Sequence, residues 1–342
     1  MLSPLMSVSV PPVHSVQSKQ ALEPALLGPV PLPPDGQPVR PFLKWAGGKR
    51  QLLPRLRRFY PETFRAYREP FLGSGAVFFD LVNSGRLAGH PVVLCDSNAD
   101  LVGCYTRLRD EPDSVIRRLR RLAAGYARAP KEHYYRVRDR QFNPKRHAMA
   151  KGTGLKGDQY TVELAAALVY LNHTGFNGLF RVNASGGFNV PLGRYANPRI
   201  CDEDNLRRVA AVLSESAVSI GQVPYLDSLA DAEAHDFVYL DPPYAPLNST
   251  SQFTSYTSDG FARGEQESLQ KAVIGLAERG CQVLLSNSTA PQVAELYDRN
   301  PDAERVGLRA YKIPAKRAIN SNAARRGPVL EYLITNLPER TS

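Results

Sequence analysis

Short apolar runs alternate with segments of helical periodicity along most of the chain. Three of these runs lie at residues 91–96, 237–241 and 282–286, and each closes on a polar residue. Runs of this length, apolar on both faces, are typical of parallel strands that helices cover from both sides. Between the second and third runs, apolar positions repeat at helical spacing. Gly280, a favourable residue for the C′ position after a helix, closes this segment. The pattern predicts an α/β domain built around a parallel sheet.

The middle of the chain departs from this alternation. Asp113 is placed to cap a helix whose apolar positions share one face. Residues 162–171 are apolar nearly all round, which predicts a buried helix. Residues 179–183 and 188–192 flank an Ala-Ser-Gly-Gly sequence and predict a β-hairpin with a glycine turn. We therefore expect a mostly helical insertion that carries one hairpin.

These patterns divide the chain into three parts. Residues 105–215 form the expected insertion, and residues 41–104 together with 216–338 form the α/β domain around it. Residues 1–40 contain nine prolines, few charges and no periodicity. Such a composition cannot bury a core, so we expect a disordered leader or an overlong start there.

Positive charge is concentrated in the insertion. The chain has 43 Lys and Arg residues against 33 Asp and Glu, a net charge of +10. Residues 105–210 alone contain 20 basic and 10 acidic residues, which accounts for the whole excess. This distribution favours an acidic partner such as nucleic acid. The arginines of residues 117–121 would also suit a solvated helix face.

Cysteine usage and apolar length exclude several classes of protein. The four cysteines form no CxxC pair and match no metal-ligand spacing with the six histidines, so we expect reduced thiols and no metal centre. No apolar stretch reaches the ~20 residues of a membrane span, and the first residues lack the pattern of a signal peptide. We expect a soluble, cytoplasmic protein without a membrane partner.

The most informative motif is Asp241-Pro242-Pro243-Tyr244, at the end of a predicted strand. In open parallel sheets, ligands bind beyond the carboxyl ends of the strands, so this motif should line a site. The Asp241 carboxylate and the Pro242 carbonyl could accept both N–H bonds of an aromatic amine, and Tyr244 offers a face to its ring. Two acceptors draw the nitrogen lone pair out of ring conjugation and make the amine nucleophilic. A double-proline turn that only ends a strand is the structural alternative.

A second motif combines Glu69 with a glycine loop at Gly73 and Gly75. The loop lacks the third glycine of the dinucleotide fingerprint and the Lys-Ser/Thr of a P-loop, so it does not indicate a pyrophosphate or a triphosphate. Asp96 ends the next predicted strand, where an acid commonly holds ribose hydroxyls. A nucleoside-like cofactor without phosphate, such as S-adenosylmethionine, fits this pair, although turn glycines and strand-end acids are common in themselves.

A third motif spans residues 42–49 and contains the only tryptophan of the chain, Trp45. The glycines that follow it allow a ligand to approach the backbone closely, and Lys44 and Lys49 add positive charge. A glycine turn at the start of a hydrophobic domain would give the same sequence, so the residues alone leave both interpretations open.

Taken in order, these motifs resemble the DNA adenine methylase (Dam) family, the alpha-ordered group of D12-class DNA N6-adenine methyltransferases. The resemblance runs from about Phe42 to Asn336 and includes FLKWAGGK, EPFLGSG, the acid Asp96, an insertion and DPPY. Further segments similar to the family are residues 177–183, 187–195, 321–322 and 325–326. The proline-rich leader has no counterpart in the family pattern.

The resemblance implies a Rossmann-like S-adenosylmethionine-dependent methyltransferase sheet with an inserted target-recognition domain. The residues that it implies for cofactor binding are Trp45, Lys49, Glu69, Phe71, Gly73, Gly75, Asp96 and Asp241. Those that it implies around a flipped-out adenine are Asp241, Pro242, Pro243 and Tyr244. Those that it implies at the DNA are Lys44, Phe176, Asn177, Leu179, Arg181, Asn183, Pro191, Arg194 and Tyr195.

The resemblance further implies adenine N6-methylation of double-stranded DNA by a monomer, most often in GATC. It leaves open whether a cognate restriction endonuclease accompanies the protein. N4-cytosine methylation is the nearest alternative, but that family usually has Ser in place of Asp241. Methylation of RNA or of protein glutamine would leave the hairpin unexplained. A DNA-binding protein that has lost catalysis would not need Asp241 and Tyr244.

Overall fold

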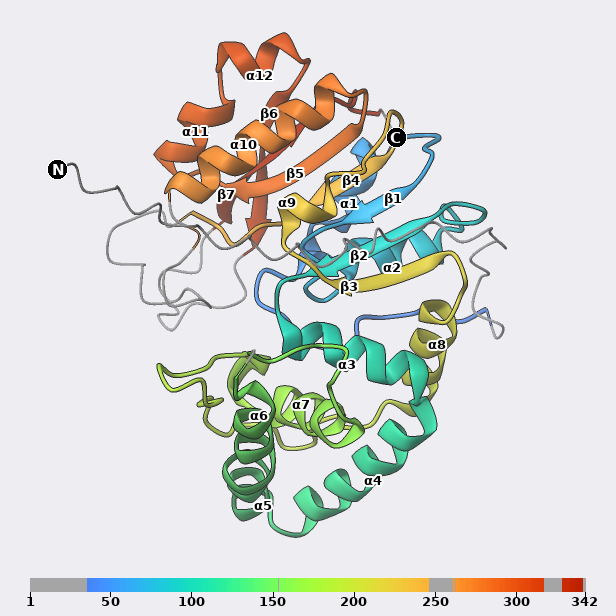
Figure 1. The fold of residues 1–342 in the computed structure, drawn as a ribbon, viewed down its shortest axis with the longest axis vertical. Coiled ribbons are helices and arrows are strands. Elements are labelled where there is room, and N and C mark those ends of the chain that lie inside the picture. Colours follow the sequence, from blue (N-terminus) through green and yellow to red (C-terminus); the bar gives the residue numbers. More distant parts are fainter. Residues whose placement is uncertain (1–35, 153, 246–260, 262, 317–327, 341–342) are drawn as a thin grey trace, which may run out of the picture.

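A seven-stranded sheet organises the molecule (Figure 1). The computed structural model describes residues 36–152, 154–245, 261, 263–316 and 328–340. Within them the strand order is β3-β2-β1-β4-β5-β7-β6. β7 is antiparallel to its neighbours β5 and β6, and the other pairings are parallel. The strands are β1 (Tyr67–Glu69), β2 (Val92–Asp96), β3 (Val218–Gln222), β4 (Phe237–Leu240), β5 (Gln282–Ser288), β6 (Arg309–Lys316) and β7 (Pro328–Thr335).

The predicted α/β class and the Rossmann-like sheet are confirmed. The three apolar runs of the sequence form β2, β4 and β5. Along β4, Phe237 and Tyr239 belong to one buried cluster, whereas Val238 and Leu240 belong to another. Alternate side chains of a strand point to opposite faces, so this sheet is covered on both sides.

Helices on the two faces supply the partners of these clusters. α2 packs into the cluster of Phe237, and α10 to α12 pack into the cluster of Val238, on the opposite face (Figure 1). Gly280 has φ +83°, as a helix C′ glycine requires after α10. The helices around the sheet are α1 (Leu53–Leu56), α2 (Ala76–Asn83), α9 (Tyr225–Ser228), α10 (Arg263–Glu278), α11 (Pro291–Tyr297) and α12 (Pro301–Arg305).

The helical insertion leaves the sheet after β2 and returns at β3, and it forms the lower part of Figure 1. Its helices are α3 (Ala99–Asp110), α4 (Pro112–Arg128), α5 (Pro130–Arg136), α6 (Asn143–Ala150), α7 (Val162–Thr174) and α8 (Glu203–Leu213). The predicted buried helix is α7, which Thr161 caps by accepting from the Leu164 amide. The boundary expected between residues 104 and 105 falls inside α3, and one apolar cluster joins the sheet to α4 and α7.

The predicted role of Asp113 as a helix cap is wrong. α4 begins at Pro112, with Glu111 at its N-cap position, so Asp113 lies within the first turn. Proline is favoured at the first helical position because the amide that it lacks would have no partner there. Asp113 instead pairs with Arg207 of α8 at 2.7 Å, and Arg120 of the basic face pairs with Glu203. α8 therefore neutralises part of the arginine face.

Part of the segment predicted as a disordered leader is fixed in the structure. Residues 1–35 lie outside the described part, but Val39 is only 2% exposed, which contradicts disorder up to residue 40. The Asn83 side chain bonds both the amide and the carbonyl of Val39, and Asn205 does the same for Arg40. These two asparagines fix an irregular segment that has no periodic signal.

The predicted hairpin is present only as a short paired loop. Val182 and Phe188 form a single antiparallel bridge, and the expected strands at 179–183 and 188–192 do not extend beyond it. Side chains of other elements take the remaining backbone groups. Asn143 of α6 bonds both the amide and the carbonyl of Phe188, and Tyr134 donates to the carbonyl of Val190. The backbone pairing itself consists of the Asn183–Gly187 and Asn189–Arg181 hydrogen bonds beside the bridge, and Leu192 pairs with Gly175 instead of the first segment.

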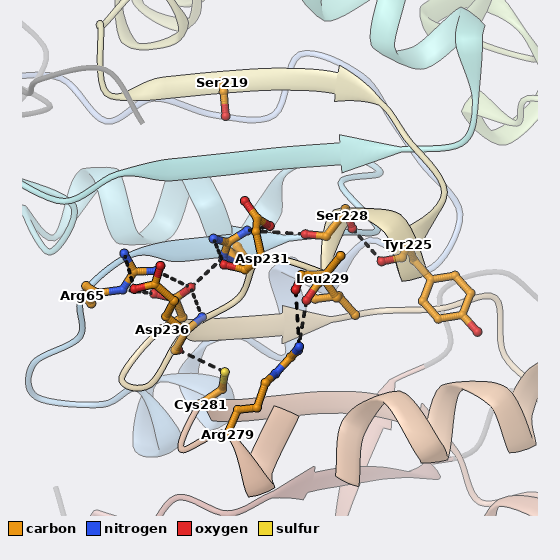
Figure 2. Close-up of polar contacts among 12 residues, drawn as sticks. Arg65, Ser219, Tyr225, Ser228, Leu229, Asp231, Asp236, Arg279 and Cys281 are labelled. Atoms are coloured by element: carbon orange, nitrogen blue, oxygen red, sulfur yellow. Dashed lines mark hydrogen bonds and ion pairs between the residues drawn. The ribbon is translucent and has the colours of Figure 1, made fainter. Parts of the chain in front are cut away.

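A buried charge network ties β1 to the chain that precedes β4 (Figure 2). The Arg68 guanidinium pairs with Asp236 at 2.7 Å and with Asp231 at 2.8 Å. The Asp236 side chain is fully buried, whereas that of Asp231 is 56% exposed. Arg68 also donates to the Ser228 carbonyl of α9, so the network positions α9 beside the sheet.

We predict that Asp236→Asn lowers the free energy of unfolding by about 3 to 5 kcal/mol, because it leaves the Arg68 cation buried without its main partner. The matched variant Asp231→Asn removes the exposed partner of the same guanidinium and should cost less than about 1 kcal/mol. Urea-induced unfolding measures both. Equal losses in the two variants would contradict this assignment.

Candidate active site

Three acidic residues meet at the carboxyl edge of the sheet. Glu69 is the last residue of β1, Asp96 is the last residue of β2, and Asp241 directly follows β4. β2 and β4 flank β1 on opposite sides, so the chain reverses its direction across the sheet at this point. Ligands of open α/β sheets bind at such a switch point. The structure thus brings together the acids of three separate sequence motifs.

Lys49 links the first motif to the last. Its ammonium lies 2.7 Å from Asp241 Oδ1 and 4.6 Å from the centre of the Tyr244 ring. The side chain is only 4% exposed, and it also donates to the Gly47 carbonyl at 2.7 Å. A buried ammonium is stable only beside such acceptors. Lys49, Asp241 and Tyr244 therefore form one packed group.

Two further residues hold this group, and the sequence analysis did not identify them. Ser286 of β5 donates to Asp241 Oδ1 at 3.2 Å, and Glu331 of β7 accepts the Tyr244 hydroxyl at 2.7 Å. Ser286 directly follows the apolar residues 283–285, and Glu331 is the one charged residue of β7, which is the only signal that the sequence contains for them. Pro242 is buried and Pro243 is exposed beside them.

The glycine loop is shaped by close contacts with the first motif. Gly73 has φ +48°, and a Cβ there would lie 3.2 Å from Cδ1 of Trp45. Its amide donates to Asp96 Oδ2 at 3.1 Å. Gly75, with φ +65°, begins α2. A side chain at either glycine would strain the left-handed backbone and crowd the loop. Trp45 in turn stacks on Phe180 of the paired loop at 5.4 Å.

Burial perturbs all three carboxyl groups. It raises the pKa of Glu69 to about 8, against the opposing hydrogen bond from the Tyr67 hydroxyl. It raises the pKa of Asp96 to about 6, although the amides of Asn98 and Gly73 favour the carboxylate. Burial also raises the pKa of Asp241, and the Lys49 cation counteracts this. Perturbed acids of this kind cluster at functional sites.

The residues at this edge fit a cationic nucleoside. Glu69 and Asp96 have no ion-pair partner among the described residues, so a ligand carrying positive charge would compensate them. Phe71, two residues before Gly73, stacks on Tyr225 of α9 with 5.1 Å between the ring centres, and the two rings form an aromatic surface. The Tyr225 hydroxyl is buried without a hydrogen-bond partner in the described structure. Within the same residues, no group of His, Cys, Asp and Glu is arranged to hold a metal ion.

The residues expected at DNA form a second group around Lys44. The Lys44 ammonium lies 4.3 Å from the centre of the Tyr195 ring. Phe176 is 47% exposed, although it is large and apolar, and its amide donates to the Pro191 carbonyl at 2.8 Å. Asn177 beside it has φ +54°. An exposed aromatic on such a tight turn is suited to contact a partner rather than the core.

Other expected DNA residues contribute to the loop itself. Arg181 is exposed, and its Nε donates to Asn189 Oδ1 at 2.7 Å. Asn183 uses its Oδ1 to accept from the Gly187 amide, so it holds the turn. Leu179 is half-buried against the core, whereas Arg194 is exposed. The family-like residues 321–322 and 325–326 lie outside the described part.

Comparison with known proteins identifies the family. A family model described as D12 class N6 adenine-specific DNA methyltransferase matches residues 45–319. The chain belongs to this family. The reaction named by the family is methyl transfer to N6 of adenine in DNA, and DNA methyltransferases generally take the methyl group from S-adenosylmethionine. In the part of the chain that the structure describes, none of the helices has the length and apolar character needed to cross a membrane.

Several methyltransferases are similar to the chain over most of their length. The type II methyltransferase M.MjaIII of Methanocaldococcus jannaschii is 39% identical over 309 residues, which cover 87% of this chain and 99% of that protein. The type II methyltransferase M1.LlaDCHI of Lactococcus lactis is 36% identical, over 87% of this chain and 95% of that protein. The DNA adenine methylase of Escherichia coli K12 is 33% identical, over 87% and 96% respectively.

We predict that Glu69 makes the stability of this methyltransferase fall as pH rises. Its pKa of about 8 in the folded state exceeds that of the unfolded chain, so the folded state binds the extra proton until the pH approaches 8. Glu69→Gln should therefore flatten the fall in unfolding free energy between pH 6.5 and 8 by about 1 to 2 kcal/mol.

Chemical denaturation at several pH values checks this effect, and the window lies above the pKa of Asp96, about 6. The exposed Glu62, 76% accessible, supplies the control, since Glu62→Gln should keep the wild-type slope. Identical slopes for Glu69→Gln and the wild type would show that Glu69 is already ionised in the folded protein.

Proposed function

We propose that the protein methylates N6 of adenine in double-stranded DNA, in GATC, after the base has left the helix. The observation that carries this proposal is the group formed by Asp241, Tyr244 and Lys49 at the carboxyl edge of the sheet. The GATC target rests on the resemblance of the recognition segments to the Dam family. We propose that residues 105–215 act as the target-recognition domain and that one chain is sufficient for activity.

Asp241 is the acceptor that we assign to the adenine amine. Lys49 and Ser286 both bond Oδ1, so Oδ2 is the atom that we assign to the amine hydrogen. The Lys49 cation favours the ionised form of Asp241, which opposes the effect of burial. The Pro242 carbonyl follows in the chain and would accept the second hydrogen. Both acceptors then stabilise the positive charge that develops on the attacking nitrogen.

Tyr244 is the surface on which we propose that the adenine ring stacks. Its hydroxyl is fixed by Glu331 at 2.7 Å, and Lys49 lies over the ring at 4.6 Å. One ring face is therefore occupied, and we propose that the other receives the base. A fixed ring sets the position of the amine before the reaction, and such alignment can supply several kcal/mol of the barrier reduction.

The cofactor site that we propose lies between the glycine loop and Asp96. When bound, S-adenosylmethionine supplies a methyl group activated by a sulfonium centre. Asp96 would accept the ribose hydroxyls, and Phe71 with Tyr225 would cover the nucleobase. A cationic ligand would favour the ionised forms of Glu69 and Asp241, which burial opposes. Lys49 and Trp45, both from the first motif, would border the cofactor site beside the glycine loop.

Removing the base from the duplex costs a few kcal/mol, which contacts to DNA must offset. The net charge of the insertion gives sequence-independent attraction to phosphates. Phe176 is exposed and rigidly held, so we propose that it occupies the space that the adenine vacates. Lys44, Arg181 and Arg194 are the side chains that we propose for contacts with bases or backbone.

We predict that Asp241→Ala lowers the transfer of labelled methyl groups to adenine at least 100-fold, in the range found when one essential polar group of an active site is removed. The protein should remain folded at reduced stability, since Lys49 keeps the Gly47 carbonyl as an acceptor, and near-ultraviolet circular dichroism would show the retained fold. Asp204→Ala, an exposed acid on α8, is the control and should be fully active. Substantial activity in Asp241→Ala would refute the assignment of the acceptor.

We predict that Arg181→Ala relaxes the choice of sequence by about 1 to 3 kcal/mol at one base pair, since a contact to a base edge is worth that much. Sequencing of methylated bases in cellular DNA reports both the base and its context. Arg128→Ala, at the exposed end of α4, should weaken binding at most, without changing preference. An unchanged preference in Arg181→Ala would remove Arg181 from the recognition set.

A further inference from the structure

Residues 39–49, which we call the strap, cross from the sheet domain to the insertion and are held by asparagine side chains. Asn83 of α2 bonds the amide and carbonyl of Val39 at 2.8 and 2.9 Å. Asn205 of α8 bonds those of Arg40 at 2.9 Å each. Asn172 of α7 bonds those of Lys44 at 2.8 Å each. A side-chain amide matches a peptide group in donor and acceptor, so each asparagine takes the place of a neighbouring strand.

Asn172 differs from the other two because it also holds the DNA-facing loop. Its Nδ2 donates a second hydrogen bond, at 2.8 Å, to the carbonyl of Gly178. Asn172 is only 1% exposed, and its two amide hydrogens and its oxygen are all engaged. One buried side chain therefore sets the distance between the strap at Lys44 and the loop at Gly178.

The strap and the loop are in tight contact at this point. A Cβ on Gly178 would lie 2.6 Å from Cβ of Lys44, and the φ of Gly178 is +63°. Phe176 and Asn177 directly precede it, and Trp45, next to Lys44, stacks on Phe180 of the same loop. Five residues after Lys44, the strap places Lys49 on Asp241. A shift at Asn172 would therefore move Lys44 relative to the loop of Phe176 and Asn177.

We propose that Asn172 is a positioning residue for sequence recognition, which sets Lys44 and the loop of Phe176 and Asn177 in one fixed arrangement against the target bases. The inference rests on the proposed function, since it assigns those residues to DNA. Asn172 is buried and does not touch the DNA in this assignment. It acts through the backbone of Lys44 and Gly178.

Asn172→Asp tests the proposal with almost no change in shape. The carboxylate can still accept from the Lys44 amide, but it cannot donate to the carbonyls of Lys44 and Gly178. Unpaired carbonyls beside a buried carboxylate repel, so the strap and the loop should separate. We expect kcat/KM on a GATC duplex to fall about 100-fold, as a displacement of about 1 Å can cause. Discrimination against duplexes with one changed base pair should fall about tenfold.

Asn83→Asp is the matched control. It breaks the same kind of clamp on the same strap, at Val39, but it has no contact with the loop. It should lower the melting temperature and leave the discrimination between duplexes unchanged. Equal losses of discrimination in both variants, or unchanged discrimination in Asn172→Asp, would overturn the proposal, because the asparagine would then only stabilise the fold.

Gly178→Ala decides the matter if Asn172→Asp does not fold. It pushes the loop away from Lys44 but leaves the side chain of Asn172 unchanged. Lost discrimination between duplexes would support the proposal, and retained discrimination would overturn it. The wild type serves as the test of the proposed function in the same assay. If it methylates none of the duplexes, the proposed function fails and the inference falls with it, a result distinct from a failure of Asn172→Asp alone.

Discussion

The ion pair between the buried Lys49 and Asp241 is the constraint on which the site depends. It joins the strap of residues 39–49 to the residue that follows β4, and the insertion lies between them in the sequence. A buried ammonium cannot remain without its acceptors, so the strap must reach the sheet edge whenever the protein is folded. The ion pair therefore fixes the strap beside the residue that we assign as the acceptor for the amine.

The electrostatics of this edge favour a cationic ligand. Glu69, Asp96 and Asp241 lie at the ends of adjacent strands, and Lys49 is paired with only one of them. Burial raises the pKa values of Glu69 and Asp96, which expresses the cost of holding these acids away from water. A bound ligand that carries a sulfonium and an ammonium group would reduce that cost. This gives a physical reason for three acids to lie together in the fold.

The insertion and the sheet behave as one packed body. The division at residue 104 that the sequence pattern suggests cuts through α3, and one apolar cluster extends from the sheet into α7. Asparagine clamps then fasten the strap to α2, α7 and α8. The loop that we assign to recognition is therefore fixed to the same packed elements as the proposed acceptor, which suits an enzyme that must place one base within about 0.5 Å.

The sequence by itself determined the α/β class, three of the central strands, the buried helix α7 and the motifs that end the strands, because periodicity and strand-end chemistry are local properties of the chain. It did not determine which side chains complete the site. Glu331 reaches Tyr244 from β7, and Asn172 reaches Lys44 across 128 positions of sequence. It also misplaced the cap of α4 and the start of order, and it predicted longer hairpin strands. Those features depend on hydrogen bonds between side chains and distant backbone groups, and only the packing of helices against the sheet brings such partners together.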